Sequence, residues 1–326
     1  MNRAGRKPAS HTIDRLAPGS RVAVIRLRSL GDCVLCTPAL QLLRNYRPDL
    51  KIGVVVEDRF AAVFDNPLPP TVRALRDFAP DLCLNLHGGT RSARLTLLSG
   101  AKVRAGFDIF TPGWIYNQPI PTAQETLGVS RRVHTAEHAA SAMFYLGVPI
   151  GEIPRAGVFA PKGRSEFAPD GFAPDGFAPD GFAPDGFAPD GRYAVIHPMA
   201  ATPEKTWPAE KFAALARTLD LEPVFIGAAE EDLSPFKQWR TVTGAALPEV
   251  ARLMRDASLF IGNDSGPAHV AAAFGVPVVV LFGPSDEEVW SPWRTTAVVL
   301  KARGPIESIS VDEAVRAVGT CRGVCK

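Results

Sequence analysis

The stretch IGNDSGPAHVAAAFGVPVVVLFGP, residues 261–284, decides the fold. A buried strand ends at its start, and a short polar loop, residues 263–266, leads into a helix. Pro267 suits the first helical position, where a missing N–H is tolerated. A second apolar run, residues 276–282, predicts the next strand. Strand, helix and strand in this order indicate a parallel sheet covered by helices.

The same alternation extends in both directions from this stretch. Apolar runs predict further strands at residues 21–26, 51–56, 82–86, 193–197, 223–227 and 259–262. Helical patterns lie between them, and the first of these helices is expected to end near Arg44 with Pro38 in its first turns. We therefore predict an α/β protein with two Rossmann-like, doubly wound parallel-sheet units whose strand-end loops face each other across a cleft.

A five-residue unit, FAPDG, is repeated five times without variation from Phe167 to Gly191. Helices and sheets do not tolerate a proline every five residues, so the repeat is interpreted as a low-complexity linker. The alternative is an array that displays phenylalanines to a partner. The expected domains are a basic, disordered tail (1–20), a first lobe (21–160), the linker (161–191) and a second lobe (192–326).

Composition excludes several classes of protein. The formal net charge is 36 − 34 = +2, which gives no general attraction to nucleic acid. No apolar run approaches the roughly 20 residues that span a bilayer, and the basic N-terminus lacks the apolar stretch of a secretory signal. Five cysteines, an odd number, favour reduced thiols in a cytoplasmic protein. The Cys33-x-x-Cys36 pair is interpreted as buried helix core, with a zinc or redox site as the alternative.

The loop and helix start at residues 263–269 have the properties of an anion site. Free backbone N–H groups and the helix dipole favour negative charge at a helix N-terminus. Ser265 adds a hydroxyl, and Gly266 lets the backbone approach a ligand closely. The structural alternative is that Asp264 or Ser265 simply caps the helix and that His269 is an ordinary core or surface residue.

Three separated motifs together resemble glycosyltransferase family 9, the ADP-heptose:lipopolysaccharide heptosyltransferases. The second-lobe motif is NDSGPAH (263–269), followed by AAAFGVP. The first-lobe motif is RLRSLGD (26–32), which leads into TPAL (37–40). A third match, KTWP (205–208), precedes a helix, and weaker similarity runs from about Arg21 to Val318.

The resemblance implies a GT-B architecture, with the acceptor held mainly by the first lobe and the nucleotide sugar by the second. It also implies inverting transfer of heptose from ADP-heptose to a lipopolysaccharide inner-core acceptor of the Kdo–lipid A type. No obligatory metal and no cofactor are expected, and the sequence contains no Asp-x-Asp metal–diphosphate motif.

Individual roles follow from the same resemblance. Asp32 matches the base that takes the acceptor proton, whereas its alternative role is to cap the helix that follows. Lys205 matches the phosphate-binding lysine, which would stabilise the leaving group. Glu230, with Glu231 nearly equivalent, is expected to bind the ribose diol. The remaining donor-binding candidates are Thr202, Leu247, Asp264, Ser265, Gly266 and His269.

The acceptor is expected to be an acidic glycolipid. Arg91 and Arg94 lie three residues apart on a predicted helix, and Arg104 follows, so these cations could bind carboxylates or phosphates. A solvated helix face is the alternative. Gly31 is a further acceptor-site candidate. Such an acceptor would bring a cytoplasmic monomer transiently to the inner-membrane surface.

Two positions depart from the family pattern. Met199 and Ala200 stand where glycine and hydroxyl residues are common in the family, so phosphate contacts there must come from the backbone or from Thr202. Three alternatives therefore stay open: a transferase that uses another nucleotide sugar, a sugar-nucleotide epimerase, and a catalytically degenerate nucleotide-binding module.

Overall fold

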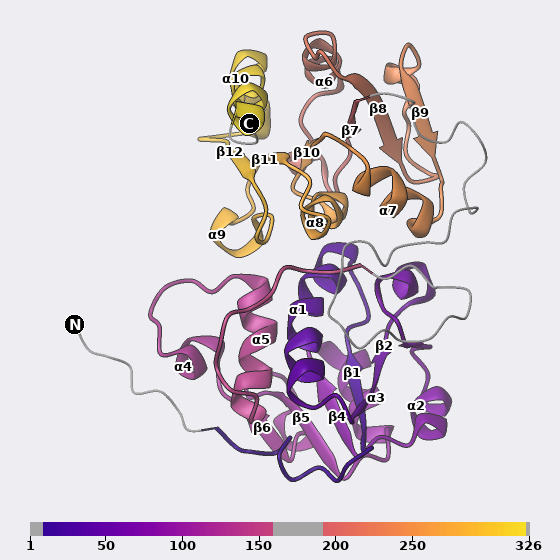
Figure 1. The fold of residues 1–326 in the computed structure, drawn as a ribbon, viewed down its shortest axis with the longest axis vertical. Helices are drawn as coiled ribbons and strands as arrows, with labels where there is room; N and C mark the ends of the chain where they lie inside the picture. Colours follow the sequence, from indigo (N-terminus) through magenta and orange to yellow (C-terminus); the bar gives the residue numbers. More distant parts are fainter. Residues whose placement is uncertain (1–8, 159–191, 324–326) are drawn as a thin grey trace. The chain divides into compact units, whose positions relative to one another are not determined.

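The computed structural model describes residues 9–158 and 192–323 of the 326-residue chain. The chain divides into two compact units, Met1–Ala156 and Gly157–Lys326, each built around one six-stranded parallel sheet (Figure 1). The FAPDG linker, residues 1–8 of the expected tail and Cys325 lie outside the described residues.

The sheet of the first unit has the strand order β3-β2-β1-β4-β5-β6. Its strands are β1 (Arg21–Ile25), β2 (Lys51–Val55), β3 (Pro67–Leu68), β4 (Leu82–Asn85), β5 (Val103–Phe107) and β6 (Gln118–Ile120). Its helices are α1 (Leu30–Tyr46), α2 (Val72–Phe78), α3 (Gly89–Leu98), α4 (Ala123–Leu127) and α5 (Thr135–Leu146). Helix α1 packs beside α5, and α2 contacts α3 (Figure 1). The strand order reverses between β1 and β4, so a binding site is expected at the carboxyl ends of these strands.

The second unit repeats this plan with the order β12-β11-β10-β7-β8-β9. Its strands are β7 (Tyr193–His197), β8 (Glu222–Gly227), β9 (Arg240–Thr243), β10 (Leu259–Asn263), β11 (Val278–Phe282) and β12 (Ala297–Lys301). Its helices are α6 (Ala209–Ala216), α7 (Leu247–Arg255), α8 (Gly266–Ala273), α9 (Glu287–Trp290) and α10 (Val311–Gly323). Here the order reverses between β7 and β10. The prediction of two doubly wound α/β units is confirmed.

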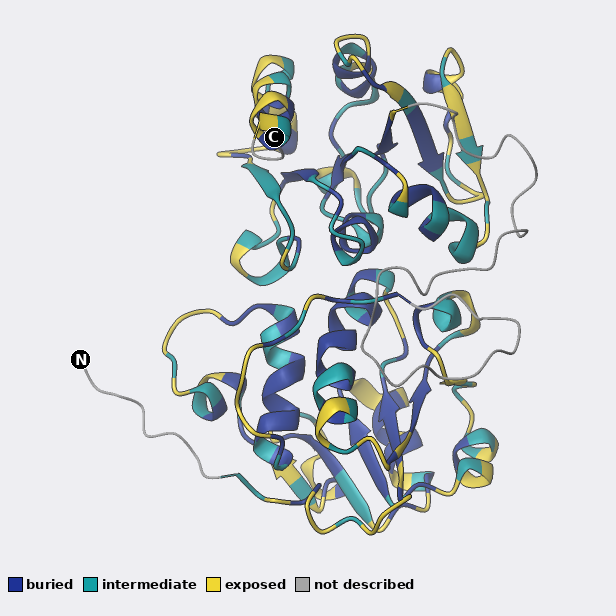
Figure 2. Cartoon of the chain, in the orientation of Figure 1, coloured by how far each residue is buried: buried dark blue, intermediate teal, exposed yellow. Residues whose placement is uncertain are grey.

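The central strands of both sheets are buried because helices cover them, whereas edge strands such as β9 are more exposed (Figure 2). Trp207, from the KTWP motif, anchors the core of the second unit and is fully buried. Its indole Nε1 donates to the Ile309 carbonyl at 2.9 Å, and its backbone N–H donates to Asn263 Oδ1 at 3.0 Å. The motif therefore fixes the loop after β7 against the end of β10.

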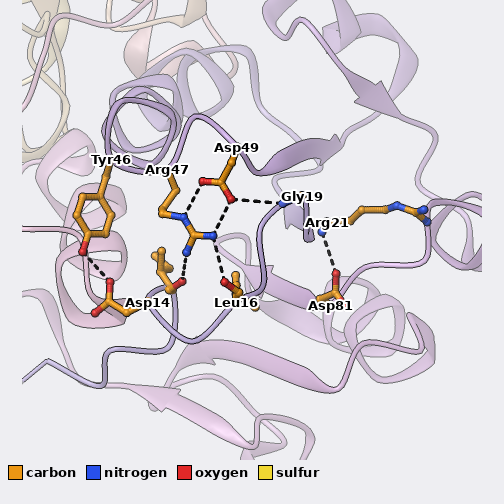
Figure 3. A network of polar contacts seen from close by, with 9 residues as sticks. Asp14, Leu16, Gly19, Arg21, Tyr46, Arg47, Asp49 and Asp81 are labelled. Atoms are coloured by element: carbon orange, nitrogen blue, oxygen red, sulfur yellow. Dashed lines mark hydrogen bonds and ion pairs between the residues drawn. The ribbon is translucent and has the colours of Figure 1, made fainter.

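Residues 9–20 are not the disordered tail that the sequence predicts. The Ser10 N–H donates to the Tyr145 carbonyl at 2.7 Å, and the side chain of Ile13 is fully buried. Arg47, at the end of α1, donates to the carbonyls of Ile13 (2.7 Å) and Leu16 (3.1 Å) (Figure 3). A buried isoleucine and an arginine that binds main-chain carbonyls hold this segment to the first unit.

Acidic side chains complete the same network. The Tyr46 hydroxyl donates to Asp14 at 2.6 Å (Figure 3). Arg47 donates twice to Asp49, at 2.7 Å from each donor nitrogen, and this hydrogen bonding lowers the pKa of Asp49 to about 2. The N-terminal segment and the turn after α1 therefore share one arginine.

Helix α1 starts earlier than expected, so Pro38 lies in its interior instead of its first turns. Proline cannot donate the main-chain hydrogen bond that would reach the Val34 carbonyl. The Thr37 hydroxyl donates to that carbonyl at 2.7 Å. A neighbouring side chain thus replaces the bond that the proline removes.

Candidate functional site

In the second unit, helix α8 begins directly after the carboxyl end of β10. Ser265 is the N-cap residue of α8, and Gly266 and Pro267 are the first two residues of the helix. The Ser265 hydroxyl lies 3.1 Å from His197 Nδ1, at the end of β7, and does not cap the helix. Pro267 has no N–H and the Ala268 N–H donates to the Ser265 carbonyl at 3.2 Å, so Gly266 carries the first-turn N–H that is left for a ligand. A helix start of this kind attracts phosphate.

A lysine lies beside that helix start. Lys205 Nζ is 3.4 Å from Asp264 Oδ2, and the two side chains are 32% and 9% exposed. The loop that carries Lys205 passes close to β11, where a Cβ on Gly283 would lie 2.5 Å from the Glu204 carbonyl oxygen. Glycine at 283 therefore permits the approach that brings the cation to α8.

Glu231 and His197 join the site from β8 and β7. Glu231 Oε2 lies 3.5 Å from His197 Nε2 and accepts the Ala228 N–H at 2.7 Å. Hydrogen bonding to His197 is the main cause that lowers the pKa of Glu231. Glu230, the first choice from the sequence, is exposed, whereas Glu231, the alternative, contacts the residues at the strand ends. Sequence reasoning gave His197 no role, although a histidine that ends a buried strand was a signal.

The other donor-site candidates lie around the same strand ends. Thr202 Oγ1 is buried and, among the residues described, has no hydrogen-bond partner. His269 is buried in α8. Leu247 is the half-buried first residue of α7. Met199 packs against the core of the second unit, which explains an apolar side chain at this position.

In the first unit, Asp32 lies at the carboxyl end of β1. It is the third residue of α1, after the buried Gly31, and its carboxylate pairs with the guanidinium of Arg26. The Ser29 hydroxyl donates to its second oxygen at 3.0 Å. Ser29 holds the N-cap position, so Asp32 is not the cap residue. Arg26 is itself held in place, because its Nη1 donates to the carbonyl of Leu86, the residue directly after β4, at 2.6 Å.

The expected arginine group is only partly assembled. Arg91, in the first turn of α3, pairs with Glu57 at 2.9 Å, and Arg94 is exposed on the same helix. Arg104 lies elsewhere, in the amino-terminal half of β5, where its Nε donates to the Ile115 carbonyl at 2.8 Å. The Arg104 guanidinium therefore holds the loops at the amino-terminal end of β5 together. It does not lie beside Asp32, which is at the carboxyl end of β1.

Two histidines that the sequence did not single out lie near Asp32. Burial lowers the pKa of His138, in α5, to about 4, and its ring lies 4.1 Å from that of Phe107, the last residue of β5. Burial also lowers the pKa of His87, and the charge of Arg26 acts in the same direction. The charges of Arg26 and Asp32 act on both imidazoles, and the lowered pKa values favour the neutral form of both rings.

Cys33 and Cys36 belong to the core of α1, as expected. Both are buried free thiols, and burial raises the pKa of Cys36 to about 12. Across residues 9–158 and 192–323, the acidic, histidine and cysteine side chains form no group of three suited to a metal ion. Within the same ranges no helix is long and apolar enough to cross a membrane.

The chain is similar to known proteins over most of its length. The sequence model of glycosyltransferase family 9 (heptosyltransferase) matches residues 71–313. Lipopolysaccharide heptosyltransferase 3 of Escherichia coli K12 is 27% identical over 301 residues, 83% of this chain and 85% of that protein.

Solved structures share the fold. A glycosyltransferase family 9 protein from Veillonella parvula superposes with a TM-score of 0.76 at 22% identity, over 96% of this chain and 98% of that chain. The E. coli heptosyltransferase WaaC with ADP gives 0.71 at 17% identity, over 92% and 99%. The expected GT-B fold is confirmed.

Proposed function

This chain belongs to glycosyltransferase family 9, and we propose that it moves heptose from ADP-heptose to a lipopolysaccharide inner-core acceptor of the Kdo–lipid A type. The observation that carries the proposal is the start of α8, with Lys205 beside it. Together they provide the Gly266 N–H, the positive end of a helix dipole and a cation for the diphosphate of a nucleotide sugar.

In the proposed reaction the acceptor hydroxyl attacks the anomeric carbon from the side opposite the diphosphate, so the configuration inverts. The new C–O bond forms as the bond to the diphosphate breaks. Asp32 accepts the hydroxyl proton, and Arg26 and Ser29 hold its carboxylate in place. Lys205 and the positive end of the α8 dipole, with the Gly266 N–H, stabilise the charge of the departing ADP. No step requires a metal ion or a cofactor.

The other candidates bind and orient the donor. Glu231, more than Glu230, suits the ribose hydroxyls, because it lies at the end of β8 beside His197. Thr202 has a buried hydroxyl to offer a phosphate, and His269 and Asp264 line the start of α8. Leu247 is proposed to contact the base.

The acceptor side is proposed to be Arg91, Arg94 and the backbone at Gly31, near the carboxyl ends of β1 and β4. Exposed arginines suit the carboxylates and phosphates of an acidic glycolipid. We propose that the enzyme works as a monomer in the cytoplasm and contacts the inner membrane transiently through its acceptor. We do not propose nucleic acid as a partner.

The test is nucleotide release from a panel of ADP-, UDP- and GDP-sugars, with and without Kdo-bearing lipid, in wild type and Asp32→Ala. Acceptor-dependent release of ADP from ADP-heptose that disappears in Asp32→Ala supports the proposal. Turnover of another nucleotide sugar would reject ADP-heptose as the donor. Tight nucleotide binding without turnover of any donor would favour a degenerate binding module.

A further inference from the structure

Three side chains at the carboxyl ends of β7, β8 and β10 form one continuous chain of contacts. His197 lies in the middle: its Nδ1 is 3.1 Å from Ser265 Oγ, and its Nε2 is 3.5 Å from Glu231 Oε2. The His197 side chain is 8% exposed, so water does not readily replace either partner. Because Ser265 begins α8, this chain ends at the anion site.

We propose that His197 is a positioning residue that takes up a proton when a nucleotide diphosphate binds, and that this turns the Ser265 hydroxyl into a donor to the phosphate. The inference rests on the proposed function, since it places the diphosphate at the start of α8.

The protonation state of the imidazole decides which way the hydroxyl points. A neutral imidazole has one N–H and one lone pair. When Nε2 carries the proton, it faces the Glu231 carboxylate, and Nδ1 then accepts the hydrogen of Ser265. The serine oxygen is left with lone pairs only, and these repel a phosphate oxygen.

The two remaining states differ in cost. A proton on Nδ1 alone releases the Ser265 hydrogen, but it sets the lone pair of Nε2 against the Glu231 carboxylate. The imidazolium satisfies both neighbours: Nε2–H faces Glu231, Nδ1–H donates to Ser265, and the hydroxyl hydrogen is free for the ligand. A bound phosphate therefore favours the doubly protonated ring.

The surrounding charges are compatible with this proton uptake. Glu231, from the segment after β8, is the anion that faces the ring, and the Ala228 N–H at 2.7 Å holds it there. Asp264, after β10, and Lys205, in the loop after β7, form an ion pair at 3.4 Å, so their charges largely balance each other. Histidine is the side chain that exchanges a proton near neutral pH.

Calorimetry on the full chain tests the proposal with ADP-heptose, a diphosphate diester that takes up no proton itself near neutral pH. Titrations in HEPES and in Tris, whose ionisation enthalpies differ, give the number of protons taken up per bound ligand. We expect a net uptake of protons on binding, and the affinity should therefore fall as the pH rises. The variants His197→Gln, which cannot titrate, and Ser265→Ala, which keeps the imidazole and removes the hydroxyl, should show neither effect.

The outcomes separate the inference from the function on which it rests. Tight binding with no proton uptake, or uptake that persists in both variants, overturns the role of His197 and leaves the donor site intact. Failure of wild type to bind ADP-, UDP- or GDP-sugars overturns the proposed function, and the inference with it. Ser265→Ala is a small change at a helix start. If His197→Gln fails to fold, the loss or persistence of proton uptake in Ser265→Ala still tests the inference.

Discussion

Replacing Lys205 with methionine removes the only side-chain cation assigned to the proposed leaving group. Near a protein surface, two unit charges about 4 Å apart interact by about 4 kcal/mol. The Lys205 side chain is 32% exposed, so solvent screens part of this energy. Loss of one preorganised charge-stabilising donor typically costs about 10²–10³-fold in kcat. We expect Lys205→Met to lower kcat by that factor.

The neighbouring Asp264 complicates a single substitution. Its side chain is 9% exposed and loses its 3.4 Å partner when Lys205 is removed, so an unpaired carboxylate would then face the diphosphate. The double variant Lys205→Met with Asp264→Asn removes this repulsion without restoring the cation. If Lys205 stabilises the leaving group directly, the double variant stays about as slow as the single one.

The assay is acceptor-dependent ADP release, measured at saturating donor so that kcat is separated from donor affinity. Lys205→Arg keeps a cation and should retain more activity than Lys205→Met. The reasoning is refuted if Lys205→Met loses less than about tenfold in kcat, or if Asp264→Asn restores the rate.

Three further predictions concern other parts of the chain. Asp32→Asn should lower kcat by about 10²–10⁴-fold while calorimetry shows unchanged donor affinity; weakened donor binding would contradict its role as base. The pKa of His138 is about 4 in the folded chain and 6.5 in the unfolded chain, so the unfolded chain binds the proton first as the pH falls. The free energy of unfolding is therefore highest above pH 6.5 and decreases as the pH falls toward 4. Denaturant titrations at several pH values should show that His138 accounts for a decrease on the order of 3 kcal/mol in the free energy of unfolding. The variant His138→Gln should make that free energy depend less on pH. Trp207→Ala should cost about 3–5 kcal/mol in the second unit. Trp114→Ala, at a side chain 71% exposed, is the matched control and should change stability by less than about 0.5 kcal/mol in thermal or denaturant unfolding.

The sequence predicted the two sheets well because parallel strands buried on both faces are continuous apolar runs. It also located the start of α8, since proline and glycine after a polar loop are strong local signals. The start of α1 was harder to predict from the sequence. The helix begins at Leu30 and includes Pro38, because the Thr37 hydroxyl replaces the missing main-chain hydrogen bond. A compensation of that kind depends on the folded geometry.

Tertiary contacts explain the other differences. Nothing in the polar N-terminus indicated that Ile13 would be fully buried, or that Arg47 would bind its carbonyl. Arg104 follows Arg91 along the chain, but helix α3 runs between them, and Arg104 therefore lies in the amino-terminal half of β5, at the other end of the sheet. The choice between Glu230 and Glu231 depended on which side chain turns toward His197, and adjacent positions in a loop do not reveal that.

In the proposed function, the two units use one architecture for two chemistries. In each, a diagnostic motif follows a strand that borders the reversal in strand order: RLRSLGD follows β1, and NDSGPAH follows β10. After β1 the helix start presents a carboxylate, Asp32, which an arginine orients and which is the proposed proton acceptor. After β10 it presents the positive end of a helix dipole with Lys205 beside it, which suits an anion. The topology fixes where each site lies, and the few residues at each helix start decide what that site can bind.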